Sequence, residues 1–495
     1  MTPGVKLISP DYIAHARCQF LEDDKLEEFL DYCGRPLRKS IRINTLKITV
    51  DEAKAHFERE GFELTSIPWC PQGFWISALV ERSAQAIPPK SNVEADISLG
   101  NLLEHLQGLF YIQEASSMLP PIALMHQQST QKKSPLVLDL AAAPGSKTTQ
   151  LAALLDNTGL IIANEMSASR TKILYANLVR CGVSNTCISQ FDGNKFRGRL
   201  SNLFDYVLLD APCGGEGTIR KDPNALLDWQ LDKVQTLAKL QKELILTAYH
   251  CLKPGGRLVY STCTLSKEEN HQVAEYLITE TTARIERLDD LFEGANRSVT
   301  SQGFLHVLPQ DYDSEGFFVA AFNKPMSANG DLDVVTQTSP FVPLSLKTQS
   351  QIQDYYCNHF GLDILNLNKV LRQRDREVWL FPQYFDMVSK RVRLNRSGIK
   401  LAEIYPNKIR SSHEFAIALD DSIQQQKVNL TESQAEDFFK GRNLEFSKCD
   451  GYKDGEVLLT INSRAIGIGQ LQKGKIKNLL PRDRVLDKLS LRSIF

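Results

Sequence analysis

Residues 136–147 have the sequence LVLDLAAAPGSK, in which an apolar run ends in a loop of small residues. The run, Leu136 to Leu140, has a single polar position, which is typical of a strand buried on both faces of a parallel sheet. A predicted helix follows the loop, Ala141 to Lys147, so a nucleotide-like ligand can approach the loop backbone at the helix N-terminus. This stretch predicts an open α/β sheet with a ligand site at the carboxyl end of the strand.

The alternation of strand and helix continues over residues from about 101 to 325, which makes this part the predicted core of the protein. The dinucleotide fingerprint GxGxxG is absent, and Ser146 interrupts the Gly-Lys pair that a phosphate loop requires. Both of those nucleotide-binding motifs are therefore disfavoured. Further strands are expected at 160–163, 187–190, 206–209, 257–260 and 316–322, the last of which is expected to close the sheet.

The chain of 495 residues is longer than one core usually organises, so we expect several domains. Near the N-terminus, Ile41 to Leu46 alternates like a strand, and Thr49 with Glu52 forms a capping-box signature for a helix that Gly61 can end. Residues 324–331 are rich in turn formers and predict a linker. The predicted domains are 1–100 (α+β), 101–325 (α/β), 340–405 (a further α/β stretch) and 406–495, a β-rich tail with strands at 457–461, 465–471 and 475–480.

The composition is that of an ordinary globular protein, with 42% hydrophobic and 24% charged residues. The formal net charge of −1 provides no general attraction to phosphates, so binding of nucleic acid would need local basic patches. The ten cysteines include no CxxC pair, and no histidine cluster has metal-ligand spacing. Since free thiols fit a reducing compartment and no apolar run resembles a signal peptide or a membrane span, we expect a cytoplasmic, non-membrane protein without a metal.

Three acidic residues follow the strands beyond the loop: Glu165, Asp192 and Asp210. Glu165 lies about twenty residues past the loop, where a carboxylate can accept hydrogen bonds from ribose hydroxyls. Asp192 could accept from an adenine amino group. Alternatively, each acid caps the turn or helix that follows it. Three acids at three successive strand ends favour the ligand interpretation.

Two cysteines also follow predicted strands. Cys213 lies in DAPCGGEG (210–217) and Cys263 in STCT (261–264). A single cysteine of this kind is most often an inert, buried side chain. Two thiols downstream of a ligand loop suggest covalent chemistry on a bound base.

These motifs, together with GLFYIQEASS (108–117) and residues 38–46, resemble the NOL1/NOP2/Sun family of S-adenosylmethionine-dependent RNA cytosine-C5 methyltransferases. The resemblance covers roughly residues 38 to 322. It implies a Rossmann-like class I S-adenosylmethionine-dependent methyltransferase sheet, with S-adenosyl-L-methionine as the cofactor. It implies a cofactor site formed by Ala141, Ala142, Ala143, Pro144, Gly145, Ser146, Lys147, Glu165, Asp192 and Asp210. The alternative for Lys147 is a solvated lysine at a helix start.

Pyrimidine C5 is a poor nucleophile, so a covalent route first adds a thiolate to C6 and makes C5 an enamine carbon that can attack a sulfonium methyl. Afterwards the C5 proton must leave and the thioether bond must break, which requires a base or a second assisting group. A carboxylate hydrogen-bonded at N3 would stabilise the charge that develops in the ring, and Asp210 is the candidate.

The residues alone do not rank the two cysteines as nucleophiles. DNA cytosine methyltransferases use the cysteine of a Pro-Cys motif, which would select Cys213. The RNA family that this chain resembles uses the Thr-Cys position instead. The resemblance therefore implies Cys263 as the nucleophile and Cys213 in product release.

Basic residues indicate where RNA could bind. Arg220 to Pro223 follows the Cys213 loop and could hold the RNA backbone, unless it is only a solvated turn. Seven basic residues oppose only Glu403 between 390 and 410, a local signal for RNA or else a solvated face: Lys390, Arg391, Arg393, Arg396, Lys400, Lys408 and Arg410. In the tail, Lys475 and Lys477 would share one face of a strand and could contact phosphates.

The tail from Gly451 to Val485 resembles a PUA-like RNA-binding domain, and residues 1–100 are expected to bind RNA as well. With the domain before it, this tail is most similar to the bacterial branch of the family that acts on small-subunit ribosomal RNA. The resemblance implies methylation of 16S rRNA within the 30S subunit, at cytosine 1407 of the decoding region, by a monomer. The alternatives are the same chemistry on tRNA or DNA, and a non-catalytic ribosome-assembly factor, which would need neither thiol.

Overall fold

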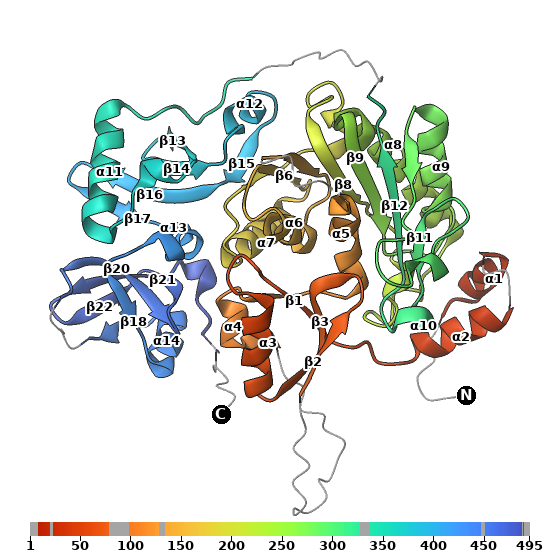
Figure 1. Ribbon diagram of the computed structural model, residues 1–495, viewed down its shortest axis with the longest axis horizontal. Coiled ribbons are helices and arrows are strands. Elements are labelled where there is room, and N and C mark those ends of the chain that lie inside the picture. The colour runs from red at the N-terminus through yellow and green to blue at the C-terminus, as the bar shows by residue number, and fades with distance from the viewer. Residues whose placement is uncertain are drawn as a thin grey trace, which may run out of the picture.

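The computed structural model describes residues 8–19, 23–78, 99–127, 134–326, 337–446, 451–487 and 489. The described residues form four β-sheets (Figure 1). The second and largest is central, and the third and fourth lie together on its left in that view. Of the predicted linker at 324–331, the part from Ser327 onward lies outside the described residues.

The N-terminal part has two helices and a small antiparallel sheet of strand order β2-β3-β1-β4. The capping box is confirmed, because Thr49 Oγ1 accepts from Glu52 N and the Glu52 carboxylate accepts from Thr49 N. The first strand ends before Asn44, whose side-chain amide donates to two distant carbonyl oxygens. The elements are α1 (Pro10–Gln19), α2 (Asp23–Cys33), β1 (Ser40–Ile43), α3 (Val50–Arg59), β2 (Phe62–Ile67), β3 (Cys70–Ala78), α4 (Leu103–Leu106) and β4 (Phe110–Ile112).

The central sheet has nine strands in the order β10-β12-β9-β8-β5-β6-β7-β15, with β11 beside β12. Its five middle strands are parallel, which confirms the predicted α/β fold class. The elements are α5 (Leu119–Met125), β5 (Leu136–Asp139), α6 (Ser146–Leu154), β6 (Leu160–Asn164), α7 (Ala168–Arg180), β7 (Thr186–Ser189), β8 (Phe204–Asp210), α8 (Leu231–Cys251), β9 (Leu252–Thr262), α9 (His271–Glu280), β10 (Arg284–Glu286), β11 (Leu305–Val307), α10 (Pro309–Tyr312) and β12 (Phe317–Asn323).

Helices cover both faces of this sheet. Successive side chains of a strand point to opposite faces, so Leu138 packs in one cluster with residues of α8 and α9, while Val137 packs in another with residues of α5, α6 and α7. Burial on both faces explains why β5 to β9 have almost continuous apolar runs.

The expectation that residues 316–322 close the sheet is wrong. The strand there, β12, is antiparallel to β9 and is itself flanked by β10 and β11. The opposite edge is formed by β15 (Leu394–Ser397), which comes from beyond the predicted catalytic domain and pairs with β7. Local hydrophobic pattern shows that a segment is a strand, but it does not show which strand it pairs with.

The C-terminal part contains the third and fourth sheets, of order β13-β14-β16-β17 and β18-β20-β21-β22-β19. The division into four domains stays a prediction, and we note that β4 lies beyond residue 100 and that β17 lies beyond residue 405. The elements are α11 (Leu346–Phe360), β13 (Val370–Arg374), β14 (Glu377–Phe381), α12 (Phe385–Ser389), β16 (Ile399–Tyr405), β17 (Lys408–Ser411), α13 (His413–Ala418), β18 (Lys427–Asn429), α14 (Glu432–Phe439), β19 (Leu444–Glu445), β20 (Gly455–Ile461), β21 (Arg464–Gln472) and β22 (Lys475–Asn478).

Polar contacts join the C-terminal part to the rest of the chain. Tyr175 of α7 donates to Glu414 of α13 over 2.7 Å, and Lys47 Nζ donates to the carbonyl oxygen of Ile417 over 3.1 Å. Gln107 donates to the carbonyl oxygen of Ile461 over 2.9 Å. These bonds join the C-terminal part to the helices of the central sheet through Tyr175 and to the N-terminal part through Lys47 and Gln107.

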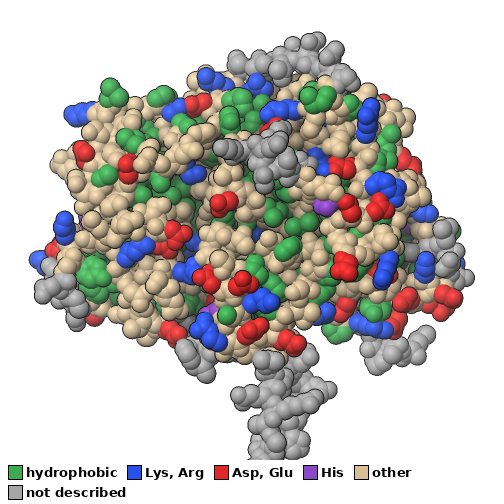
Figure 2. Space-filling model, viewed as in Figure 1, with side chains coloured by type: hydrophobic (Ala, Val, Ile, Leu, Met, Phe, Trp, Pro, Cys, Tyr) green, Lys and Arg blue, Asp and Glu red, His purple; other side chains and the backbone are tan. Residues whose placement is uncertain are grey.

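Charged side chains of both signs are interspersed over the face seen in Figure 2. Within the described ranges, no helix is long and apolar enough to cross a membrane. The same part of the chain has no group of three or more His, Cys, Asp or Glu side chains that could hold a metal ion.

Candidate active site and basic groove

The two cysteines meet at the carboxyl ends of two neighbouring strands. β8 and β9 are parallel, with Asp210 opposite Ser261, and each strand runs directly into a cysteine-containing loop. The Sγ atoms of Cys213 and Cys263 lie 3.4 Å apart, and both side chains are half-buried. The arrangement places two thiols within contact of one another and of any ligand that sits between their loops.

Lys147 and Asp210 form an ion pair beside the thiols. Lys147 Nζ donates to Asp210 Oδ2 over 2.6 Å and to Ser117 Oγ over 3.0 Å, and Ser261 Oγ donates to Asp210 Oδ1 over 2.7 Å. Burial acts to lower the pKa of Lys147, but the charge and hydrogen bond of Asp210 outweigh it, and the pKa is raised. The interpretation of Lys147 as a solvated lysine is therefore wrong.

The pKa of Cys213 is raised well above its ordinary value. The hydrogen bond with Cys263 is the main cause, followed by burial and by the negative charges of Cys263, Glu269 and Asp210. Cys213 therefore favours the thiol form in this structure.

Glu269 and Gln241 are site residues that the sequence did not indicate. Glu269 is fully buried and accepts from Gly214 N over 3.0 Å and from Gln241 Nε2 over 2.6 Å. Burial raises the pKa of Glu269 to about 7, against hydrogen bonds from Gln241 and Gly214 that act to lower it. No local signal could have found this contact, because Gln241 comes from the middle of α8.

Glu315 is a second buried acid that the sequence did not indicate. Its backbone N donates to Glu114 Oε1 over 3.0 Å, and burial together with the Glu114 charge raises the pKa of Glu315 to about 8. Lys147 is among the cations that act to lower it. Glu114 lies in the segment 108–117 that carries part of the family resemblance.

Residues 141–145 lie in the loop that joins β5 to α6, as predicted, but α6 begins at Ser146, two residues earlier than expected, so Ser146 and Lys147 belong to its first turn. Gly145 has φ 105°, and a Cβ there would lie 2.9 Å from Leu174 Cδ1, so the fold itself requires glycine. Within the described residues, Asp139 Oδ1 is buried without a hydrogen-bond partner, while Oδ2 accepts from Thr148 Oγ1 over 2.6 Å. Burial raises the pKa of Asp139 to about 7. An unsatisfied buried carboxylate oxygen beside the start of α6 is compatible with a polar ligand.

Asp210, Glu165 and Asp192 lie at the ends of β8, β6 and β7, and these strands with β5 are adjacent in the sheet. Glu165 is buried; its Oε1 accepts from Ser167 N over 2.8 Å, and its Oε2 pairs with Arg170 over 3.1 Å. Asp192 Oδ1 accepts from Asn194 N over 3.1 Å. Both acids therefore already accept local capping hydrogen bonds. Each carboxylate still has lone pairs that can accept hydrogen bonds from a ligand.

The proposed RNA contact by Arg220 is wrong. Its side chain is buried, pairs with Asp313 over 2.7 Å, and donates to the carbonyl oxygens of Pro36 and Ser314. Arg220 therefore stabilises the packing of the N-terminal part, because its donors are already engaged. The neighbouring Lys221 is exposed.

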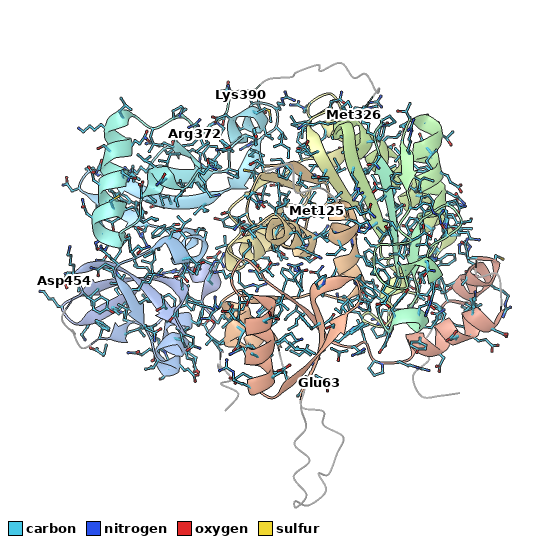
Figure 3. The ribbon with its side chains drawn as sticks, in the orientation of Figure 1. Glu63, Met125, Met326, Arg372, Lys390 and Asp454 are labelled. Carbon is cyan, nitrogen blue, oxygen red and sulfur yellow. The ribbon has the colours of Figure 1, made fainter. Side chains whose placement is uncertain are left out.

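The basic stretch from 390 to 410 does not form a single surface. Lys390 lies beside α12, at the top of Figure 3, whereas Lys408 and Arg410 belong to β17 lower in the molecule. Lys400 pairs with Glu377 over 2.8 Å and with Glu403 over 2.7 Å. The side chain of Arg396 lies outside the described residues.

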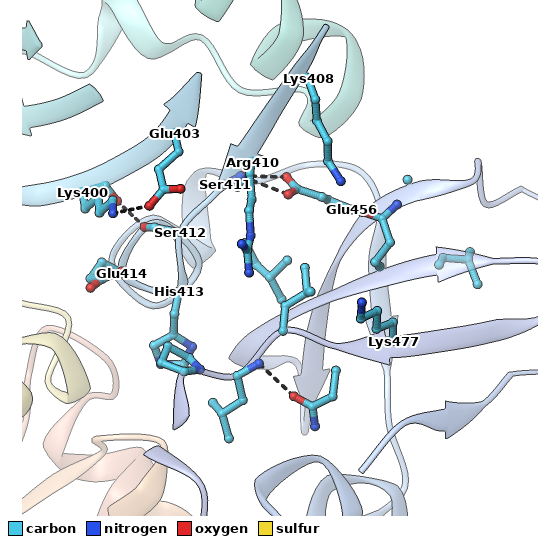
Figure 4. Close-up of a pocket in the computed structure, with 18 of the residues that line it drawn as sticks. Lys400, Glu403, Lys408, Arg410, Ser411, Ser412, His413, Glu414, Glu456 and Lys477 are labelled. Atoms are coloured by element: carbon cyan, nitrogen blue, oxygen red, sulfur yellow. Dashed lines mark hydrogen bonds and ion pairs between the residues drawn. The ribbon is translucent and has the colours of Figure 1, made fainter. Parts of the chain in front are cut away.

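A groove of about 1400 Å³ lies between the third and fourth sheets (Figure 4). Four exposed cations line it, and none has an ion-pair partner among the described residues: Lys408 and Arg410 of β17, Lys477 of β22, and Arg482. Lys475 shares the exposed face of β22 with Lys477, as predicted, but pairs with Glu445 over 2.9 Å.

Most acids of the groove are already engaged. Glu456 accepts from Ser411 N over 3.0 Å and from Tyr355 over 2.9 Å, Glu414 accepts from Tyr175, and Glu403 pairs with Lys400. These acids keep their charge, and the groove is lined by five basic residues against four acidic ones: Lys400, Lys408, Arg410, Lys477 and Arg482 against Glu403, Glu414, Asp454 and Glu456.

Comparisons with known proteins agree over most of the chain. Family models match 16S rRNA methyltransferase RsmB/F at residues 124–323, the N-terminal domain of 16S rRNA methyltransferase RsmF at 10–115, the pre-PUA domain of ribosomal RNA small subunit methyltransferase F at 341–419, and the methyltransferase RsmF PUA domain at 425–486.

Full-length relatives give the same result. The chain is 45% identical over 475 residues to ribosomal RNA small subunit methyltransferase F of Shewanella baltica, with 94% of each chain covered. It is 44% identical over 491 residues to the protein of the same name from Vibrio cholerae, with 99% of each covered.

Two solved structures resemble this protein. The crystal structure of PH0851 has a TM-score of 0.55 at 28% identity, covering 64% of this chain and 66% of that one. NSun6 from Pyrococcus horikoshii with SFG has a TM-score of 0.55 at 24% identity, covering 66% of this chain and 100% of that one, and it shows a common fold.

Proposed function

The chain belongs to the RsmB/F family of 16S rRNA methyltransferases, and from this we propose that it methylates C5 of a cytosine in 16S rRNA through a bond between Cys263 Sγ and C6 of the base. It is a methyltransferase that depends on S-adenosylmethionine. The observation that carries the covalent route is the thiol pair, 3.4 Å apart, beside the Lys147–Asp210 ion pair.

The cofactor supplies a methyl group on a positively charged sulfur when it is bound. We propose that residues 141–147, Glu165, Asp192 and Asp210 hold it, since the strands that end in the three acids are consecutive with β5 in the sheet and the loop starts a helix. The buried, unsatisfied Asp139 Oδ1 supports this placement.

In the proposed reaction, the Cys263 thiolate adds to C6, N3 of the ring takes up a proton from water, and the Asp210 carboxylate accepts a hydrogen bond from the new N3–H. Lys147 and Ser261 donate to the two oxygens of Asp210 and fix the carboxylate. Such a fixed charge costs no reorganisation when the ring charge changes. Cys213 then assists the steps that release the methylated base from Cys263.

We further propose that the substrate is cytosine 1407 of 16S rRNA in the 30S subunit, and that the enzyme acts as a cytoplasmic monomer. The names of the full-length relatives support the choice of ribosomal RNA. Bisulfite mapping of total RNA with and without this protein tests it. A single cytosine of 16S rRNA is expected to resist bisulfite conversion only when the protein is present. A cytosine that resists conversion in this way in tRNA alone would overturn the proposed substrate.

Glu165 gives a test of the proposed cofactor site. Replacing Glu165 by alanine is expected to weaken binding of S-adenosylmethionine about tenfold to a hundredfold, because a hydrogen bond to a charged group contributes about 1.5 to 3 kcal/mol. Isothermal titration calorimetry without RNA measures the change. Ser167→Ala is the matched control, because it removes the cap of α7 and keeps the carboxylate. An unchanged affinity in Glu165→Ala would remove Glu165 from the site.

The groove is the proposed binding site for the RNA backbone outside the catalytic centre. Its free cations come from two sheets, and its helix α13 is hydrogen-bonded to α7 of the central domain. RNA bound there would therefore lie at a fixed distance from the thiols. The proposed RNA binding by residues 1–100 rests on the family resemblance alone.

Replacing Lys408 and Lys477 together by glutamine is expected to weaken RNA binding and to reduce the slope of log K against log salt by about 1.4 to 1.8, since each lost phosphate contact removes about 0.7 to 0.9. The rate at saturating RNA should stay unchanged. Lys233 and Lys239, exposed on α8, provide a control pair whose replacement should leave the slope unchanged. Equal slopes for both double variants would exclude the groove.

A chain shortened to end near Pro325 would be a poorer test. It would remove β15 from the edge of the central sheet as well as the groove. Loss of activity in that shortened chain would not separate lost RNA contacts from a damaged catalytic domain.

A further inference from the structure

Two adjacent buried residues just before α9, Glu269 and Asn270, contact both cysteine loops. Asn270 Oδ1 accepts from Thr262 Oγ1 over 2.5 Å, and Asn270 Nδ2 donates to the carbonyl oxygen of Thr264 over 3.0 Å. These contacts lie on either side of Cys263. The backbone around the Cys263 thiol is thus fixed by one amide side chain.

Glu269 and Gln241 together fix the backbone around Cys213. Its Oε2 accepts from Gly214 N over 3.0 Å, after Cys213, and from Gln241 Nε2 over 2.6 Å. Gln241 Nε2 donates its second hydrogen to the carbonyl oxygen of Pro212 over 2.8 Å, before Cys213. Unlike the Asn270 contacts, these bring a carboxylate to the Cys213 loop. The other oxygen of Glu269 accepts a longer bond, 3.4 Å, from Thr264 Oγ1 in the Cys263 loop.

The charges around the two thiols therefore differ. Lys147 interacts with Cys263, whereas Glu269 and Asp210 oppose a negative charge on Cys213. The pKa of Glu269, raised to about 7 by burial and by the neighbouring Glu216, leaves it ionised above neutral pH. A negative charge on Cys213 is thus disfavoured beside the carboxylate of Glu269.

We propose that Glu269 is a positioning residue that keeps the shared proton of the thiol pair on Cys213 and leaves Cys263 as the thiolate. This inference rests on the proposed covalent function, and it supplies the physical reason for the choice between the cysteines. The proton stays on Cys213 Sγ, in its hydrogen bond to Cys263. The electron pair of Cys263 Sγ is then free to form the bond to C6, and the C5–C6 π electrons move toward C5.

Alkylation of Cys213 in a Cys263→Ala protein tests the proposal without RNA. Iodoacetamide reacts with the thiolate, so the rate followed by peptide mass spectrometry between about pH 6 and pH 10 reports the titration of Cys213. With Glu269 intact, the midpoint is expected above the ordinary thiol value of about 8.5. Adding Glu269→Gln should lower the midpoint by about one pH unit and make alkylation about tenfold faster near pH 8.

A neighbouring carboxylate provides the control. Glu268→Gln removes the charge next to Glu269 in the chain, one that contacts Gln19 and His15 of α1. It should not move the midpoint. A midpoint at or below about 8.5 with Glu269 intact would overturn the proposal, even if Glu269→Gln failed to fold. So would an equal shift in the Glu268→Gln protein. If the proposed covalent function were wrong, the Cys263→Ala protein would instead still methylate RNA.

Discussion

Replacing Cys263 by alanine is expected to abolish methyl transfer, with a loss of at least about a thousandfold, the scale seen when a catalytic nucleophile is removed. Without the thiolate no bond to C6 can form, so C5 never becomes nucleophilic. On a denaturing gel the protein and a 16S rRNA substrate should migrate separately. The measurement is transfer of a labelled methyl group to RNA, together with that gel.

The Cys213→Ala variant is expected to behave in the opposite way. Addition and methyl transfer can proceed, while release from Cys263 stalls, so a protein–RNA adduct that survives denaturant should accumulate. Cys357→Ala, which removes a half-buried thiol of α11, is the control and should behave like the unmodified protein. An adduct with Cys263→Ala and none with Cys213→Ala would reverse the roles of the two cysteines.

Asp210→Asn is expected to reduce the rate of methyl transfer about a hundredfold to a thousandfold, the usual effect of removing a preorganised electrostatic contact. The substitution keeps the size of the side chain and removes the charge that pairs with Lys147. Single-turnover rates at saturating RNA and S-adenosylmethionine isolate the chemical step from binding.

Ser261→Ala is the matched control for Asp210. It removes one donor to the carboxylate and leaves the charge and the Lys147 contact in place, so its effect should be much smaller. Thermal denaturation of both variants checks that the fold persists, since the Asn variant leaves a buried lysine without its ion pair. A normal rate for Asp210→Asn would exclude a role for this carboxylate in the reaction.

The fold class and the edge of the sheet at which the candidate active site lies both follow from the amino-acid sequence alone. Buried parallel strands have apolar runs with polar residues at their ends, and the carboxyl ends of parallel strands share one edge. For this reason the sequence alone is enough to group Asp210, Cys213 and Cys263 at one edge. The motifs around them also indicated the family, and the full-length relatives confirm it.

The partners of those residues become visible in the three-dimensional structure alone. Because β8 and β9 are adjacent, the two thiols are in contact. The packing of α8 and α9 brings Gln241 and Glu269 to Cys213. Arg220, which was expected to contact RNA, is buried in an ion pair instead. The same holds for β15, which joins the central sheet from a distant part of the chain. The hydrophobic pattern of a segment indicates its burial and its periodicity. Its partners are set by the packing of segments far apart in sequence, and that packing fixes the charge around each thiol.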